Sequence, residues 1–239
     1  DIMVATKDMY SWSDFVSTEP EAETREMVTS VSSDELKLWK TGEEFKISPD
    51  VSAEDENGNS IEAADVSVKV DSVQISDDLS LLDENKIPEE WKKAVGEDGK
   101  LVENQLSYIK AGDGIEVLDE VVKTENVKQK LVFVTATYKN NSEVTLNHIL
   151  YLGNLMLLKS KDDTYQLYIE NEQSGDNYDC IHSSSVAKAF DMDYYSVQEA
   201  YGNGGNYISA LKPGESIQVE MAWIVDENQL SNMYLNLSG

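Results

Sequence analysis

The fold class is decided by residues 130–139, which read Lys-Leu-Val-Phe-Val-Thr-Ala-Thr-Tyr-Lys. Valine, threonine, phenylalanine and tyrosine are among the side chains most favoured in β-strands. Apolar residues occupy neighbouring as well as alternate positions, so we expect both faces of this strand to be buried. The pattern predicts a central strand in a β-sheet that is covered on both sides.

Further strands are predicted on both sides of this segment. Residues 66–70 alternate valine with polar side chains, and the apolar phase then moves to Val73 and Ile75. Alternation of this kind is typical of a half-buried strand. A β-bulge near residues 71–72 accounts for the change of phase. Residues 217–223 alternate in the same way and end on Trp223.

Turn sequences separate the strands. Asn57-Gly58 supplies the positive φ angles of a tight turn, and Pro213-Gly214 stands before the strand at 217–223. Such short strands with turn signals between them favour a mainly β protein built as a β-sandwich. Trp39, Trp91 and Trp223 are expected in its core.

Two segments read differently from the strands. Residues 77–126 are predicted to be an insertion that contains a short helix near 87–96, with Pro88 in the first turn and Gly96 at the end. Residues 183–201 carry apolar side chains at helical spacing, which predicts a short helical segment. Residues 1–35 form an acidic arm or linker, either a tether or a segment packed on the domain, and residues 36–239 are expected to be a single domain.

Charge excludes several classes of protein. The 239 residues include 46 acidic and 19 basic side chains, for a formal charge of −27. An anionic surface repels phosphate backbones, so we expect no nucleic-acid partner. One cysteine permits neither an internal disulfide nor a cysteine-based metal site. The sequence contains no cofactor motif, and we expect no cofactor.

The order of strands and turns resembles a known group of domains. Three stretches carry the resemblance: the opening Lys40-Thr41-Gly42-Glu43, the strand end Tyr138-Lys139-Asn140-Asn141-Ser142, and Leu211-Lys212-Pro213-Gly214-Glu215-Ser216 before Trp223. In this order they are similar to the immunoglobulin-like domain of uncharacterised lipoproteins from Gram-positive bacteria, including gut Firmicutes. The resemblance covers residues 36–76 and 127–239. It implies an immunoglobulin-like β-sandwich, secretion, and attachment to the cell membrane through a lipidated cysteine upstream of Asp1. The long insertion departs from the family pattern.

Candidate chemistry is sparse in this sequence. Cys180 and His182 could form a thiolate nucleophile, but catalytic pairs normally come from separate elements, and an idle cysteine is the simpler interpretation. With two histidines far apart in sequence, a multi-histidine zinc site is excluded. Asp176, Asn177 and Asp179 could bind calcium in a loop; the alternative is a solvated acidic loop. No pair of carboxylates stands out for glycoside hydrolysis.

A group of tyrosines and asparagines is the strongest candidate for ligand binding. Aromatic rings and amide groups are typical of sugar- or peptide-binding patches, and nearby glycines allow a loop to adapt. The alternative is that the tyrosines pack in the core while the asparagines form a turn. The candidate residues are Tyr194, Tyr195, Tyr201, Asn203, Asn206 and Tyr207.

These observations predict a non-enzymatic module at the cell surface, which binds an extracellular protein or glycan through its loops. Membrane association is expected only through the inferred lipid anchor. Two alternatives stay open: an enzyme or accessory protein acting on glycans or the cell wall, and a structural spacer in an envelope assembly.

Overall fold

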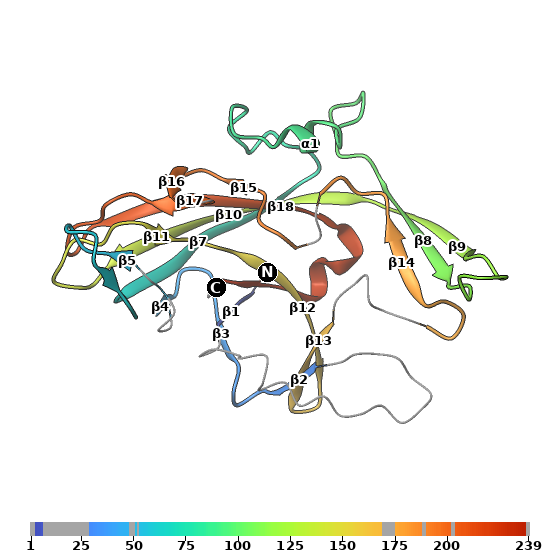
Figure 1. The fold of residues 1–239 in the computed structure, drawn as a ribbon, viewed down its shortest axis with the longest axis horizontal. Helices are drawn as coiled ribbons and strands as arrows, with labels where there is room; N and C mark the ends of the chain where they lie inside the picture. Colours follow the sequence, from blue (N-terminus) through green and yellow to red (C-terminus); the bar gives the residue numbers. More distant parts are fainter. Residues whose placement is uncertain are drawn as a thin grey trace.

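A computed structural model describes residues 3–6, 29–47, 51, 53–168, 175–187, 190–201 and 204–237 of the chain. The protein is mainly β, as predicted (Figure 1). Its helices within the described residues are α1 (Glu89–Lys92) and the 3-10 helix η2 (Glu227–Asn232). Neither is long enough to cross a bilayer.

Two large sheets make up the body of the molecule. The first has five strands in the order β15 (Tyr194–Tyr195), β18 (Ser216–Asp226), β10 (Gln129–Asn140), β7 (Val66–Ser76) and β4 (Glu44–Lys46). The second has six strands in the order β2 (Thr29–Ser32), β13 (Thr164–Tyr168), β12 (Asn154–Lys161), β19 (Met233–Asn236), β1 (Met3–Thr6) and β3 (Lys37–Trp39).

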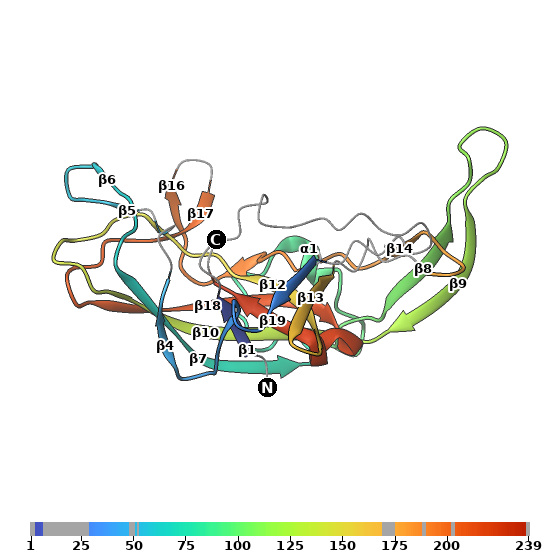
Figure 2. The ribbon, with the colours of Figure 1, turned by 90° about the horizontal axis from the view of Figure 1, so that it is seen from below.

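Three smaller sheets extend from this body. One consists of β14 (Cys180–Ser183), β8 (Asn104–Lys110) and β9 (Glu120–Val127), and a second of β11 (Ile149–Leu150), β17 (Gly204–Ile208) and β16 (Glu199–Tyr201). The third is the pair β5 (Ala53–Glu54) and β6 (Ser60–Ile61), joined through the predicted turn at Asn57-Gly58. The β8–β9 hairpin and the β5–β6 pair lie at opposite ends of the molecule (Figures 1 and 2).

The central strand occupies the position that its sequence predicts. β10 is the middle strand of the five-stranded sheet, paired antiparallel with β7 on one side and β18 on the other. Val132 and Val134 face the core shared with the six-stranded sheet, whereas Leu131 and Phe133 face a second cluster on the outer side. Both faces are therefore buried, which explains the nearly continuous apolar sequence.

The predicted bulge is confirmed. Val70 pairs with Ala136 and Ser72 with Thr135, so Asp71 is the additional residue in β7. After the bulge Val73 packs against the core, but Ile75 is exposed. Because the extra residue shifts the side-chain alternation by one position, it restores Val73 to the inner face.

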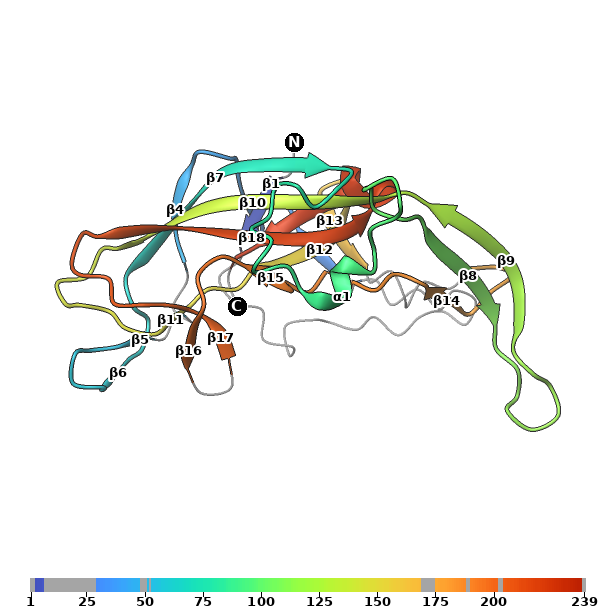
Figure 3. The same ribbon diagram turned by 90° about the horizontal axis from the view of Figure 1, so that it is seen from above.

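The predicted insertion at 77–126 combines a helix with a hairpin. Its first half carries α1 and lies over the outer face of the five-stranded sheet (Figure 3), where Leu79, Leu82 and Trp91 pack against Leu131 and Phe133. Its second half forms β8 and most of β9. Trp91 and Trp223 are both fully buried, as expected, and Trp39 is partly buried against the core.

The predicted helix at 183–201 is wrong. The described residues of this segment include the end of β14 and the whole of β15 and β16. Tyr194 packs in the outer cluster, whereas its neighbour Tyr195 packs against the shared core on the other side of the sheet. Adjacent side chains on opposite faces are the signature of a strand, so the helical spacing in the sequence was coincidental.

The acidic arm contributes strands to the body. β1 pairs in parallel with β19 and antiparallel with β3, and β2 pairs with β13. These pairings favour an arm packed on the domain over a free tether.

Candidate functional site

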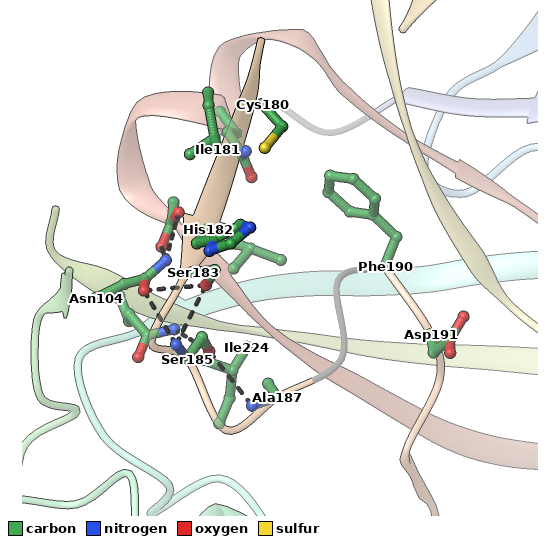
Figure 4. Close-up of a pocket in the computed structure, with 14 residues that line it drawn as sticks. Asn104, Cys180, Ile181, His182, Ser183, Ser185, Ala187, Phe190, Asp191 and Ile224 are labelled. Carbon is green, nitrogen blue, oxygen red and sulfur yellow. Dashed lines mark hydrogen bonds between the residues drawn. The ribbon is translucent and has the colours of Figure 1, made fainter. Parts of the chain in front are cut away.

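A pocket of about 770 Å³ opens where the three-stranded sheet of β14, β8 and β9 meets the body (Figure 4). This volume falls in the range of small-molecule sites. Its lining comes from β8, β14, β18, the start of β10 and η2, and it mixes hydrogen-bonding groups with apolar ones. The polar residues are Asn104, Gln129, His182, Ser183, Ser185, Asp191, Asp226 and Gln229.

Asn104 organises one wall of this pocket. Its amide nitrogen donates to both carboxylate oxygens of Asp226, at 3.1 and 2.9 Å. Its carbonyl oxygen accepts hydrogen bonds from the Ser183 hydroxyl and from the backbone N–H groups of Ser184 and Ser185, each at 3.0 Å. Asn104 and Asp226 are both buried, so one amide side chain links β8, β18 and the end of β14.

Gln129 extends this network. Its side-chain nitrogen donates to the Ser185 hydroxyl at 2.7 Å, and that hydroxyl also accepts a weaker bond from the Ala187 N–H at 3.3 Å. Gln129 is buried at the start of β10. Since its partners are already in place, the polar groups of the wall are held in position before any ligand arrives.

Cys180 and His182 both line the pocket, together with Phe190 from a different segment (Figure 4). In the pairing of β14 with β8, Cys180 lies opposite Ile109 and His182 lies opposite Ser107. Their separation by two residues on one strand places them on the same side, as predicted. Cys180 is half-buried, so its thiol has access to the cavity.

The predicted tyrosine patch is divided by the fold. Tyr194 is fully buried, and its hydroxyl accepts a hydrogen bond from the Asp83 N–H at 3.1 Å; burial raises the pKa of this phenol. Its assignment as a ligand-binding residue is therefore wrong. Tyr195 is half-buried and meets Tyr151 edge-on at 6.4 Å. The Asn206 side chain donates to the Tyr151 carbonyl, and Asn203 lies outside the described residues.

The other two tyrosines form a separate cluster on β16 and β17, away from the strand β14 that lines the pocket (Figure 1). The His148 ring stacks on Tyr201 with centroids 3.9 Å apart, and Tyr207 meets Tyr201 edge-on at 5.3 Å. Glu54 accepts a hydrogen bond from the Tyr201 hydroxyl and lies 3.1 Å from His148 Nδ1. Sequence reasoning missed Glu54 and His148, because no spacing in the chain relates β5 to β16.

Glu54 should make the stability of this cluster depend on pH. Hydrogen bonds from Tyr201 and His148 lower the pKa of Glu54 in the folded state. A carboxyl group whose pKa is lower in the folded state than in the unfolded state stabilises the fold at pH values above its unfolded pKa, about 4.3. This stabilisation is lost as the pH falls through the pKa of the folded state. We expect the melting temperature of wild type to exceed that of Glu54→Gln at neutral pH, with the gap closing below about pH 4.

Tyr201→Phe provides the control for this titration. It keeps the ring on which His148 stacks but removes the hydroxyl that bonds Glu54. Its pH-dependent stability should lie between those of wild type and Glu54→Gln. A gap between wild type and Glu54→Gln that stays constant from pH 7 to pH 3 contradicts the prediction.

The predicted calcium ligands do not converge in a cage. Asp176 and Asn177 lie exposed in the turn between Gly175 and Tyr178, while Asp179 accepts a hydrogen bond from the Ala111 N–H at 2.8 Å. No group of three or more His, Cys, Asp or Glu side chains within the described ranges could hold a metal ion. Calcium binding in this loop stays a prediction.

Comparisons with known proteins place the chain in no established group. No family model matches it, and neither a curated protein nor a solved structure is detectably similar.

Proposed function

We propose that this protein is a non-enzymatic binding module that acts outside a membrane. We propose further that its fold is an immunoglobulin-like β-sandwich. The facing sheets and the pairing of β1 with β19 support that architecture. Secretion and an upstream lipid anchor form part of the proposal, and they rest on the family resemblance. The observation that carries the binding function is the pocket at Asn104, Cys180 and Phe190.

The lining indicates the chemistry of the ligand. Amide, hydroxyl and carboxylate groups that surround one aromatic ring suit a ligand rich in hydroxyl or amide groups, such as a glycan or a peptidoglycan fragment. Asp191, Asp226 and the overall charge of −27 disfavour an anionic ligand. A neutral oligosaccharide is therefore the first class to test.

Cys180 provides a reporter for this pocket. It is the one cysteine in the sequence, so a thiol reagent labels a single position. Neutral oligosaccharides and peptidoglycan fragments should slow the labelling by dithionitrobenzoate. At ten times its Kd, a ligand that blocks the pocket leaves about one tenth of the molecules free, and labelling slows about tenfold.

A thermal-shift measurement on the same samples separates the outcomes. A ligand in the pocket should raise the melting temperature and protect Cys180 together. A thermal shift without protection means that the ligand binds elsewhere, and the His148–Tyr201 cluster is then the next site to mutate. If neither signal responds to any glycan or fragment, glycan binding at this pocket is rejected.

One observation favours a second function. Asp191 and Asp226 line the same pocket, and paired carboxylates are the machinery of glycoside hydrolysis. Asp226 already accepts two hydrogen bonds from Asn104, which leaves the exposed Asp191 as the better proton donor or base. Product release from an oligosaccharide that disappears in Asp191→Asn would favour the enzyme over the binding module.

A further inference from the structure

The loop at residues 111–119 presents aliphatic side chains to solvent. It joins β8 to β9 at the end of the hairpin, which extends away from the body (Figure 2). Ile115 is 90% exposed and Leu118 is 88% exposed. Val117 and, on β9, Val121 and Val122 are also exposed. Ile115, Val117 and Leu118 are gathered in one short loop, and exposed apolar residues grouped in this way mark an interaction site more often than single exposed ones do.

The conformation of this tip is held by hydrogen bonds. One carboxylate oxygen of Asp113 accepts the backbone N–H groups of residues 115, 116 and 117 at 2.8–2.9 Å. These bonds lower the pKa of the Asp113 carboxyl. Asp119 accepts the Gly112 N–H at 2.9 Å. Ile115 and Leu118 are therefore exposed in a defined arrangement, which reduces the entropy lost on docking.

Gly112 is required by the close packing of the same loop. A Cβ atom at this position would lie 2.0 Å from the Val117 carbonyl oxygen. Any larger residue must therefore open the loop, even though no apolar side chain is removed. A substitution at Gly112 therefore tests whether the shape of the loop matters, because it leaves the hydrophobic side chains of the loop in the protein.

Charge selects among the surfaces that could cover the tip. Asp113, Glu116, Asp119 and Glu120 lie between and beside the aliphatic residues in the sequence, and the whole chain carries a formal charge of −27. A second copy would bring like charges together, and an anionic bilayer would repel the same carboxylates. An apolar groove rimmed by lysine or arginine complements both features.

We propose that the β8–β9 tip docks into an apolar groove with a basic rim on a protein partner. Ile115 and Leu118 would fill the groove, while the surrounding carboxylates face the rim. The site is separate from the pocket at Cys180, so it does not depend on the nature of the ligand there.

A displayed library of random peptides tests this proposal. Selection on the wild-type protein, with counter-selection on Ile115→Ser/Leu118→Ser, should enrich peptides that combine large apolar residues with lysine or arginine. Burial of aliphatic side chains is a main source of binding free energy, so the double substitution should weaken the binding of an enriched peptide at least about tenfold. Raised salt should weaken it further.

Two single variants control for folding and for non-specific attraction. Val144→Ser removes an exposed apolar residue elsewhere on the surface and should leave the affinity unchanged. Gly112→Ala keeps Ile115 and Leu118 but disturbs the loop, and should weaken binding. Circular dichroism checks that each variant keeps its secondary structure.

Other outcomes overturn the proposal. Peptides that bind wild type and the double variant equally well show that the tip is not the docking element. Tip-dependent sedimentation with phosphatidylcholine vesicles assigns it to a lipid surface, and tip-dependent dimerisation in the ultracentrifuge assigns it to a second copy. Residues 111–119 do not line the pocket at Cys180, so the labelling of Cys180 tests the pocket separately.

Discussion

Replacing Trp223 by alanine should lower the free energy of unfolding by about 3–5 kcal/mol. Trp223 lies in β18 between the two large sheets and is 1% exposed. Its ring fits so closely that a Cβ atom on Gly153 would lie 2.8 Å from it. Removal of the ring leaves a cavity that neighbouring strands cannot fill. Urea unfolding followed by circular dichroism measures the loss.

Trp223→Phe is the informative partner of this variant. The buried indole N–H has no hydrogen-bond acceptor among the described residues, and an unpaired buried donor costs about 1–3 kcal/mol. Phenylalanine removes that donor and keeps much of the ring, so we expect a far smaller loss. Leu118→Ala, at a position 88% exposed, should change stability by less than about 0.5 kcal/mol. Similar losses in all three variants would contradict the assignment of Trp223 to the core.

Asn104→Ala should cost about 3 kcal/mol, because it removes the buried amide that bonds a carboxylate and several groups of the β14 wall. The Asp226 carboxylate loses two hydrogen bonds, and the N–H groups of Ser184 and Ser185 lose their acceptor. The labelling rate of Cys180 should rise as this wall loosens. Unfolding curves and labelling kinetics measure the two effects.

Asn104→Asp adds a test with a distinct dependence on pH. It places a second carboxyl group against Asp226 in a buried position, where two negative charges repel. The folded-state pKa of the new group is then raised, so its cost should grow as pH rises above about 3.9. Asn104→Ala should show no comparable growth. Gln105→Ala, at the exposed neighbouring position, should be nearly neutral, and an equal loss there would exclude a special role for Asn104.

The features predicted correctly from sequence are those determined by neighbouring residues. β10 could be recognised because a strand buried on both faces needs an apolar run. The bulge at Asp71 could be inferred because one extra residue inverts the alternation. The turn at Asn57-Gly58 follows from the backbone freedom of glycine, whose φ at Gly58 is +79°.

The features missed depend on contacts between distant residues. Asn104 is one of many asparagines, and its role arises because β8 contacts β14 and β18. The sequence at residues 103–105 does not indicate these contacts. Glu54 and Tyr201 meet for the same reason, across 147 positions in the chain. The false helix at 183–201 shows the converse limit. Apolar residues at helical spacing also arise when short strands bury opposite faces, and the local pattern cannot separate the two.

Strand β9 and the central strand β10 are separated by Lys128 alone, so the hairpin and the core share one continuous length of extended chain. Tension applied at the tip along this direction reaches β10 directly. β10 is bonded along its length to β7 on one side and β18 on the other, and a pull along its axis must break many of these bonds together, in shear. A mechanical load on the hairpin is therefore carried by β10, which is paired along its length with a strand on each side.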